Sequence, residues 1–129
     1  MTDTPQRAMH EAEAWLVSAK DKLASAEIDE SSAIVCCAQA IHAIIRANDA
    51  LTLKYLGIKS TRHDDASNLF SKLLKTHLPQ EDKRFLRLLE RAMEDKSGAD
   101  YGKASFSYEQ AARYVHEAQE FVSVMKGRI

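Results

Sequence analysis

The chain has 129 residues and a formal net charge of -1, with 45% of its residues hydrophobic and 29% charged. This balance is typical of a single soluble domain with a real core, and it excludes a disordered chain. It also excludes a protein that coats nucleic acid through its whole surface, so any polyanion would have to meet a local basic patch.

No segment is typical of a membrane protein or of a secreted one. The longest apolar run, Ala33 to Ala38, is far shorter than a membrane-spanning helix needs, and the N-terminal stretch MTDTPQRAMHEAEAW is polar where a signal peptide would be apolar. We therefore expect a cytoplasmic protein with no membrane contact. Cys36 and Cys37 are adjacent, a spacing that suits neither a disulfide between distant segments nor a zinc site, and we expect both thiols to be buried.

Two long helices are predicted for the first half of the chain. The first begins after Thr4, a candidate N-cap, with Pro5 in its first turn. Its apolar residues recur with a helical period, and they are Ala8, Ala12, Trp15, Leu16, Ala19, Leu23 and Ala26. The second helix, about Glu30 to Leu56, is apolar almost all the way round, which is typical of the central helix of a bundle, and Gly57 ends it.

Two further helices follow a polar loop, GIKSTRHDD. Thr61 and Asp64 resemble a capping box for the third helix, which Pro79 ends. Glu81 and Asp82 favour the start of a fourth helix, because negative charge stabilises a helix N-terminus. The residues that we expect to be buried in these two helices are Leu69, Phe70, Leu73, Leu74, Phe85, Leu88, Leu89 and Ala92.

The last part of the chain is predicted to be a loop and a fifth helix. The loop runs from Lys96 to Phe106 and contains two glycines, and Ser107 with Gln110 forms a candidate capping box for the helix. No segment alternates apolar and polar residues as a half-buried strand does. We therefore predict an all-α fold in one domain, residues 1–129, built as an up-and-down helical bundle of four main helices plus a shorter one.

Several enzyme signatures are absent from the sequence. It holds no Gly-rich phosphate loop, no HExxH, no CxxC and no GxSxG. A di-iron bundle would need Glu-x-x-His pairs, and none of the 5 histidines has a glutamate three positions before it. The sequence therefore predicts no metal site and no cofactor.

Polar residues recur at steps of three or four along the second helix, so they share one side of it: Gln39, His42, Arg46 and Asp49. One interpretation is structural, with Arg46 and Asp49 paired at the surface for only about 0.3–0.5 kcal/mol. The alternative is that the stripe lines a groove shared with other helices or with a second subunit. There a buried Arg46–Asp49 pair would hold the register and contact a ligand.

A row of cations lies along the fourth predicted helix, consisting of Lys83, Arg84, Arg87 and Arg91. Such a row could follow a phosphate backbone. Neighbouring acids could neutralise part of it, and they are Glu90, Glu94 and Asp95. We therefore interpret this side of the helix as a solvated face with ion pairs.

Three short segments stand in an order that is known from one family of helical proteins. They are Ala40–Leu51 with Gly57, then His63 before the third helix, then Lys96-Ser97-Gly98-Ala99-Asp100-Tyr101 before the last. Together they resemble the HEPN superfamily, the "higher eukaryote and prokaryote nucleotide-binding" domains, in its small stand-alone prokaryotic form. The resemblance spans roughly Glu30 to Lys126.

The resemblance implies an up-and-down bundle, a homodimer built on helix faces, and a polar groove at the dimer interface. In many HEPN proteins this groove cuts RNA, or the protein pairs with a small nucleotidyltransferase in a toxin–antitoxin or stress module. A nucleotide or RNA is therefore the implied ligand. A second copy of the chain and a nucleotidyltransferase are the implied protein partners.

The chain departs from the pattern of the ribonuclease members, which carry an arginine and, a few residues later, a histidine. Here the segment resembles a variant, Arg-x-x-Ala-Asp-Tyr, in which Lys96 replaces the arginine, and no histidine follows until His116. RNA cleavage without a metal needs a group that takes the 2′-hydroxyl proton, a role suited to histidine. Lys96 and Tyr101 have ordinary pKa values of about 10, so an active ribonuclease would rely on His63.

We therefore predict a protein that binds a nucleotide or RNA, or a partner that handles one. The residues expected to meet phosphate are Arg46, Lys96 and His63. Those expected to position these cations or the base are Asp49, Asp100 and Tyr101. With His42, these seven residues make up the predicted groove. The alternatives are a ribonuclease toxin that uses His63 and a non-catalytic interaction module whose polar stripe only sets the register.

Overall fold

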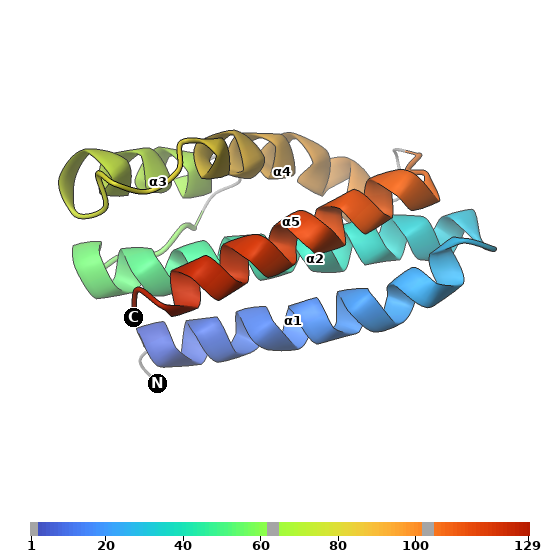
Figure 1. Ribbon diagram of the computed structural model, residues 1–129, viewed down its shortest axis with the longest axis horizontal. Coiled ribbons are helices and arrows are strands. Elements are labelled where there is room, and N and C mark those ends of the chain that lie inside the picture. The colour runs from blue at the N-terminus through green and yellow to red at the C-terminus, as the bar shows by residue number, and fades with distance from the viewer. Residues whose placement is uncertain (1–2, 62–64, 102–104) are drawn as a thin grey trace.

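The computed structural model describes residues 3–61, 65–101 and 105–129, which hold five helices and no strand. The helices are α1 (Pro5–Ala26), α2 (Glu30–Leu56), α3 (Asp65–Thr76), α4 (Arg84–Tyr101) and α5 (Tyr108–Lys126). The four long helices alternate in direction along the bundle, and the shorter α3 shares a layer with α4 (Figure 1). The predicted all-α bundle of four main helices and a shorter one is confirmed.

Helix α2 is the centre of the bundle, because it contacts each of the other four helices (Figure 1). By length and composition alone α2 is apolar enough to cross a membrane, a test that the core helix of a soluble protein also passes. The other helices bury 61% of that stretch. Cys36 and Cys37 lie in its buried part as free thiols, as predicted.

Local sequence signals set the helix ends. Thr4 and Asp29 cap α1 and α2, each through a side-chain oxygen that accepts a backbone N–H of the first turn. Gly57 ends α2 in the left-handed conformation with φ 71°, which a residue without Cβ adopts without strain. Ser107 and Gln110 form the predicted capping box of α5.

Three phenylalanines join the α3–α4 layer to α5. The ring of Phe121 packs edge-on against Phe70 and Phe85, with ring centroids 5.9 Å and 5.2 Å apart. Edge-to-face pairs contribute about 0.5–1.5 kcal/mol each beyond the burial of their area. Because Phe121 and Phe70 are wholly buried, these contacts fix where α4 lies along the bundle.

The loop predicted from Lys96 to Phe106 is wrong in its first half, because α4 continues to Tyr101. Gly98 in a helix costs only about 1 kcal/mol relative to alanine. Burial of Ala99 and an ion pair between Lys96 and Asp100, one turn apart, offset that cost. The glycine is therefore tolerated inside the helix.

Trp15, expected on the buried stripe of the first helix, is instead 38% exposed, while its neighbours Ala12 and Leu16 are buried. Its ring lies at the edge of the stripe, where it stacks on a side chain of α2. Asp64, the expected partner of Thr61 in a capping box, lies outside the described residues.

Candidate functional site

The predicted polar stripe lies on the side of α2 that faces both α1 and α4. Trp15 of α1 stacks on His42, and Asp100 of α4 contacts the same imidazole. One and two turns further along α2, Arg46 and Asp49 continue the stripe. We call this surface the polar face and define it by His42, Arg46, Asp49, Lys96 and Asp100.

The carboxylate of Asp100 joins an imidazole and an ammonium. Its Oδ1 lies 3.1 Å from Nε2 of His42, and its Oδ2 accepts a hydrogen bond from Nζ of Lys96 at 2.8 Å. The rings of Trp15 and His42 are stacked with centroids 4.8 Å apart. The side chain of His42 is still 31% exposed, so the imidazole is held on one edge and open to a ligand elsewhere.

Asp100 carries a fixed negative charge at neutral pH. Burial by itself would raise the pKa of this carboxyl, but the hydrogen bond from Lys96 and the nearby His42 hold it below its ordinary value of 3.8. A charged Asp100 orients the imidazole of His42 and keeps the ammonium of Lys96 beside it. The polar face therefore presents the ammonium of Lys96 as a group that can donate a hydrogen bond to an anion.

Arg46 fastens α1 to α2. Its guanidinium donates to Glu11 of α1 at 2.9 Å, to Asp49 at 3.0 Å, and to Asp3 at 3.2 Å and 3.3 Å. The side chains of Arg46 and Asp49 are only 17% and 5% exposed, so the interpretation of this pair as a surface pair is wrong. The contacts instead match a largely buried pair that holds the register between helices.

Asp49 also fixes the loop after α2. While one oxygen of the carboxylate binds Arg46, the other accepts the backbone N–H of Ser60 at 3.2 Å and its hydroxyl at 2.8 Å. Next to it, Nζ of Lys59 donates to Asp3 at 3.1 Å. The loop is thus tied to α2 and to the start of the chain.

A pocket of about 220 Å³ opens beside this loop, between α2 and α4. Its lining residues are Ile45, Asp49, Ser60, Thr61, Ala66, Met93 and Lys96. The lining combines the apolar side chains of Ile45 and Met93 with hydroxyl groups, the ammonium of Lys96 and the carboxylate of Asp49. Apolar walls with a few polar groups are typical of pockets for small molecules. The carboxylate of Asp49 is already bound by Arg46 and Ser60, so Lys96 is the charged group that is available to a ligand. We call this pocket the Lys96 pocket.

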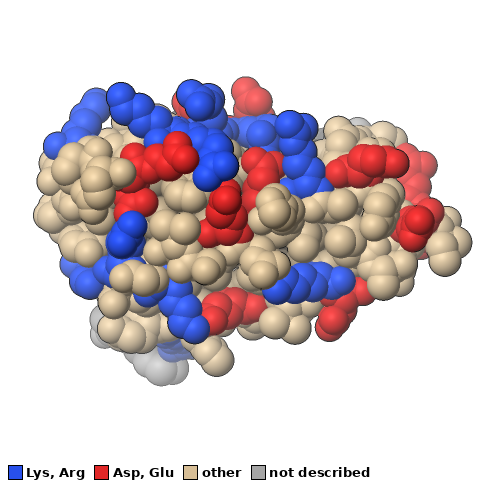
Figure 2. Space-filling model, in the orientation of Figure 1, with Lys and Arg blue, Asp and Glu red and all other residues tan. Residues whose placement is uncertain are grey.

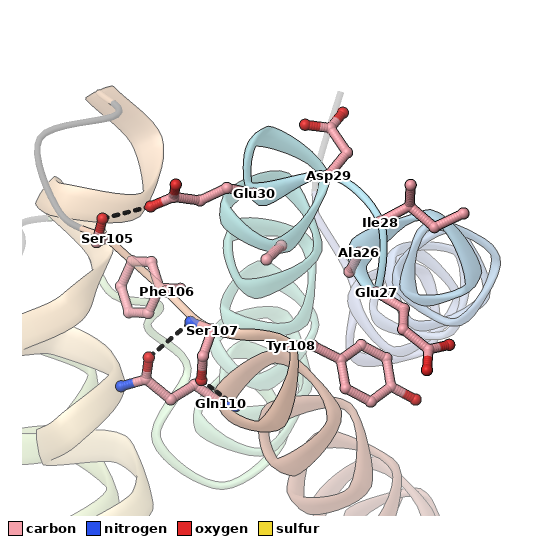
Figure 3. Close-up of a pocket in the computed structure, with 11 residues that line it drawn as sticks. Ala26, Glu27, Ile28, Asp29, Glu30, Ser105, Phe106, Ser107, Tyr108 and Gln110 are labelled. Carbon is pink, nitrogen blue, oxygen red and sulfur yellow. Dashed lines mark hydrogen bonds between the residues drawn. The ribbon is translucent and has the colours of Figure 1, made fainter.

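A larger pocket, of about 490 Å³, lies at the end of the bundle where α2 and α5 begin (Figure 3). Its rim carries the carboxylates of Glu27, Asp29 and Glu30, and no lysine or arginine is among the described residues that line it. Glu30 accepts a hydrogen bond from the hydroxyl of Ser105 at 2.5 Å across this pocket (Figure 3). Because phosphate would be repelled there, the Lys96 pocket is the better candidate for an anionic ligand.

Five of the predicted groove residues are brought together on the polar face, and two are not among them. His63 lies outside the described residues. Tyr101 ends α4 directly after Asp100 and is 74% exposed, so most of its ring faces solvent. Sequence reasoning missed Trp15, Ser60 and the Arg46 partner Glu11, because only the packing of α1 and the loop against α2 brings them to the face.

A model of the HEPN domain family matches residues 6–128, nearly the whole chain. This protein belongs to the HEPN domain family. The match confirms the resemblance and agrees with the all-α bundle. No curated protein matches the chain.

The chemistry open to the polar face of this HEPN domain is that of hydrogen bonding and proton transfer. An imidazole, an ammonium and a carboxylate lie in contact there. The described residues contain no group of three His, Cys, Asp or Glu side chains that could hold a metal ion. The polar face therefore has the means to bind an anion and to move a proton.

Proposed function

We propose that this HEPN-domain protein binds a nucleotide or RNA on the polar face, with Lys96 at the phosphate. The observation that carries the proposal is that Lys96 belongs both to the Lys96 pocket and to the His42–Asp100 cluster. An ammonium has three donors, so Nζ can keep Asp100 and still meet a phosphate oxygen. The relation to HEPN domains, which are generally associated with nucleotides and RNA, supports the same ligand.

The Lys96 pocket fits part of a nucleotide. Its volume of about 220 Å³ suits a single base or sugar, since pockets for whole drug-sized ligands are larger, about 300–1,000 Å³. A base packs on Ile45 and Met93, and the hydroxyls of Ser60 and Thr61 bind its polar edge or a ribose. Arg46, already bound to three carboxylates, acts as a positioning residue in this proposal and does not touch the ligand.

Trp15 offers a direct test, because it is the chain's 1 tryptophan and stacks on His42. Titration with AMP, ATP and short RNAs should change its fluorescence in a saturable way. Lys96→Ala should weaken binding about tenfold or more, whereas Lys20→Ala on the exposed side of α1 should not change it. An unchanged signal and an unchanged melting temperature with every ligand would instead favour an interaction module.

We further propose that the polar face meets a second copy of the chain. Trp15 and Val35 are exposed apolar residues, at 38% and 41%. Val35 lies two turns before His42 on the same side of α2, and Trp15 packs on His42 itself. A homodimer on this face would shelter both residues. Light scattering tests this proposal. The wild type and the control Val17→Glu on α1 should be dimers, whereas Val35→Glu should be a monomer.

A nucleotidyltransferase in a toxin–antitoxin or stress module is the protein partner that we propose to test first. Its support is the resemblance to HEPN proteins that pair with such enzymes. Co-expression with the nucleotidyltransferase encoded nearest to this gene, followed by co-purification, is the experiment. Failure to co-purify at physiological salt, with both proteins folded, would remove this part of the proposal and leave ligand binding untouched.

A second candidate function is metal-independent RNA cleavage by His42. The observation in its favour is the contact between Nε2 of His42 and Asp100, because a carboxylate that orients an imidazole is a recurring support for a general base. The imidazole takes the proton of a 2′-hydroxyl, whose oxygen then bonds to phosphorus. The bond from phosphorus to the 5′-oxygen breaks, and that oxygen takes a proton from the ammonium of Lys96, leaving a 2′,3′-cyclic phosphate and a 5′-hydroxyl. His42 then releases its proton to water, and Lys96 takes one up.

Cleavage assays distinguish this function from the one predicted with His63. RNA with a fluorescent 5′ end is incubated with the wild type, His42→Ala, Asp100→Asn, His63→Ala and, as a control, the exposed His116→Ala. Loss of cleavage in His42→Ala alone among the histidine variants supports this candidate, and loss in His63→Ala alone supports the other. No cleavage by the wild type leaves a binding protein.

A further inference from the structure

Residues 65–101, which form the α3–α4 layer, hold as many Asp and Glu as Lys and Arg residues, but several of their cations have no ion pair with a described residue. Figure 2 shows lysine and arginine side chains gathered along the edge of the molecule formed by this layer. Ion pairs account for only part of them. Arg84 binds Asp82 and Glu120, at 3.3 Å and 3.1 Å, and Arg91 binds Glu117 at 2.6 Å.

Several of the nearby acids are already occupied. Glu81, in the turn between α3 and α4, is buried and paired with Arg128 at the end of the chain. Glu117 also meets Arg113 at 3.7 Å. Four cations have no ion pair with a described residue, and we call them the basic row: Lys72, Lys75, Lys83 and Arg87. Against these four cations stand Glu90 and Glu94 of α4, which also have no ion pair with a described residue, so a surplus of positive charge remains next to the turn between α3 and α4.

The basic row brings no gain to the fold by itself. Lys83 directly precedes α4 and Arg87 lies in its first turn, which holds no acidic residue. Cations at a helix N-terminus oppose the helix dipole. The turn is nevertheless held firmly, because Arg128 binds Glu81 and its carbonyl accepts hydrogen bonds from Lys54 and Tyr55. The row is therefore presented on a fixed support.

The partner must be a polyanion that needs no apolar contact. The exposed large hydrophobic residues of the described chain are Trp15, Val17, Ile28, Val35, Ile58 and Tyr101, and none of them lies between α3 and the first turns of α4. Protein interfaces usually have an apolar core, whereas phosphate backbones are held by lysine and arginine alone. A nucleic acid therefore fits this surface better than an acidic protein does.

We propose that the basic row binds the phosphodiester backbone of a nucleic acid, as a surface separate from the Lys96 pocket. Arg87 and Lys96 are both on α4, about 13 Å apart along the helix axis at 1.5 Å per residue. A chain of several nucleotides can cross the basic row while a mononucleotide in the pocket cannot reach it. The row thus selects for polynucleotides over free nucleotides.

The test is binding of fluorescein-labelled U20 RNA, and of dT20 DNA, across a salt series. With four backbone contacts on a single strand, the logarithm of the binding constant should fall with the logarithm of salt with a slope of about -3. Lys83→Gln/Arg87→Gln should weaken binding at least tenfold and make the slope shallower by about 1.4. The control Lys20→Gln/Lys22→Gln removes the same charge from α1 and should change neither. Circular dichroism confirms that each variant is folded.

The outcomes separate this surface from the pocket. Loss of U20 binding in the Lys83/Arg87 variant supports the proposal if the variant binds AMP as well as the wild type does. It also supports the proposal if AMP binds to neither protein. Equal loss in the α1 control, or no U20 or dT20 binding by the wild type at low salt, overturns it. Poly-glutamate of similar length that binds as tightly as U20, through the same residues, also overturns it and assigns the row to an acidic protein.

Discussion

His42 and Asp100 are 58 positions apart in the chain, yet the imidazole Nε2 of one lies 3.1 Å from the carboxylate of the other. The contact exists because α4 continues to Tyr101 and so carries Asp100 back across α2. Lys96, one turn earlier, reaches the same carboxylate. The end of α4 is thereby joined to the polar stripe of the central helix.

Asp100 should stabilise the folded protein at neutral pH, and this stabilisation should be lost at low pH. Its pKa in the folded protein is below the ordinary value of 3.8, so its contribution is fully present above about pH 5 and is lost as the pH falls through the folded pKa. Asp100→Asn should lower the free energy of unfolding by about 1 kcal/mol at pH 7. In this variant the free energy of unfolding should also fall less steeply as the pH is lowered. Urea unfolding between pH 2.5 and pH 7 measures both effects. If the free energy of unfolding fell as steeply with pH in the variant as in the wild type, Asp100 would not be the group responsible.

Arg46→Met should be the most damaging change on the polar face. It leaves the nearly buried carboxylate of Asp49 without its cation, together with Asp3 and Glu11. Removing one partner of a buried pair costs about 3–5 kcal/mol. Thermal and urea unfolding at pH 7 give the value. Arg113→Met, whose side chain is 73% exposed, is the matched control and should stay within about 0.5 kcal/mol of the wild type.

Gly57→Ala should destabilise the end of α2 by about 1 kcal/mol. The reason is the backbone, since φ is 71° and a Cβ there would meet nothing within 4 Å. Gly57→Asn should cost less, because asparagine adopts the left-handed conformation more readily. If urea unfolding showed equal losses for alanine and asparagine, the conformational explanation would be wrong.

The two thiols should be unreactive until the protein unfolds. Burial raises the pKa of Cys36 to about 11, and burial together with its neighbours raises that of Cys37 to about 12. The thiolate that attacks a disulfide reagent is therefore scarce at pH 8 in the folded state. Reaction with a chromogenic disulfide should be slow without urea and fast in 8 M urea. Rapid labelling of either thiol in the folded protein would show that α2 is not buried as described.

The sequence predicted the helices and the bundle because each depends on local signals. The 3.6-residue stripe of α1, the Ser107–Gln110 capping box and Gly57 are all readable without knowledge of the partner helices. The full length of α4 could not be predicted, because Gly98 favours a loop locally, and the burial of Ala99 and the ion pair between Lys96 and Asp100 outweigh that preference. Tertiary packing decides such a case.

The polar face could be predicted only in part for a similar reason. Helical spacing places His42, Arg46 and Asp49 on one side of α2, but it cannot show that Asp3 and Glu11 surround the guanidinium of Arg46. The cations in α4 and just before it give a further example. The expected ion pairs are present at Arg84 and Arg91, whereas Lys83 and Arg87 have no such pair among the described residues.

The central claim is that Lys96 and its pocket hold a nucleotide or RNA. Calorimetric titration of the wild type, Lys96→Ala and Lys20→Ala with AMP, ATP and a five-nucleotide RNA, at two salt concentrations, tests it most directly. We expect saturable binding of at least one ligand that weakens with salt, falls tenfold or more in Lys96→Ala and is unchanged in Lys20→Ala. Binding that is the same in Lys96→Ala as in the wild type, or no binding by the folded protein, would contradict it.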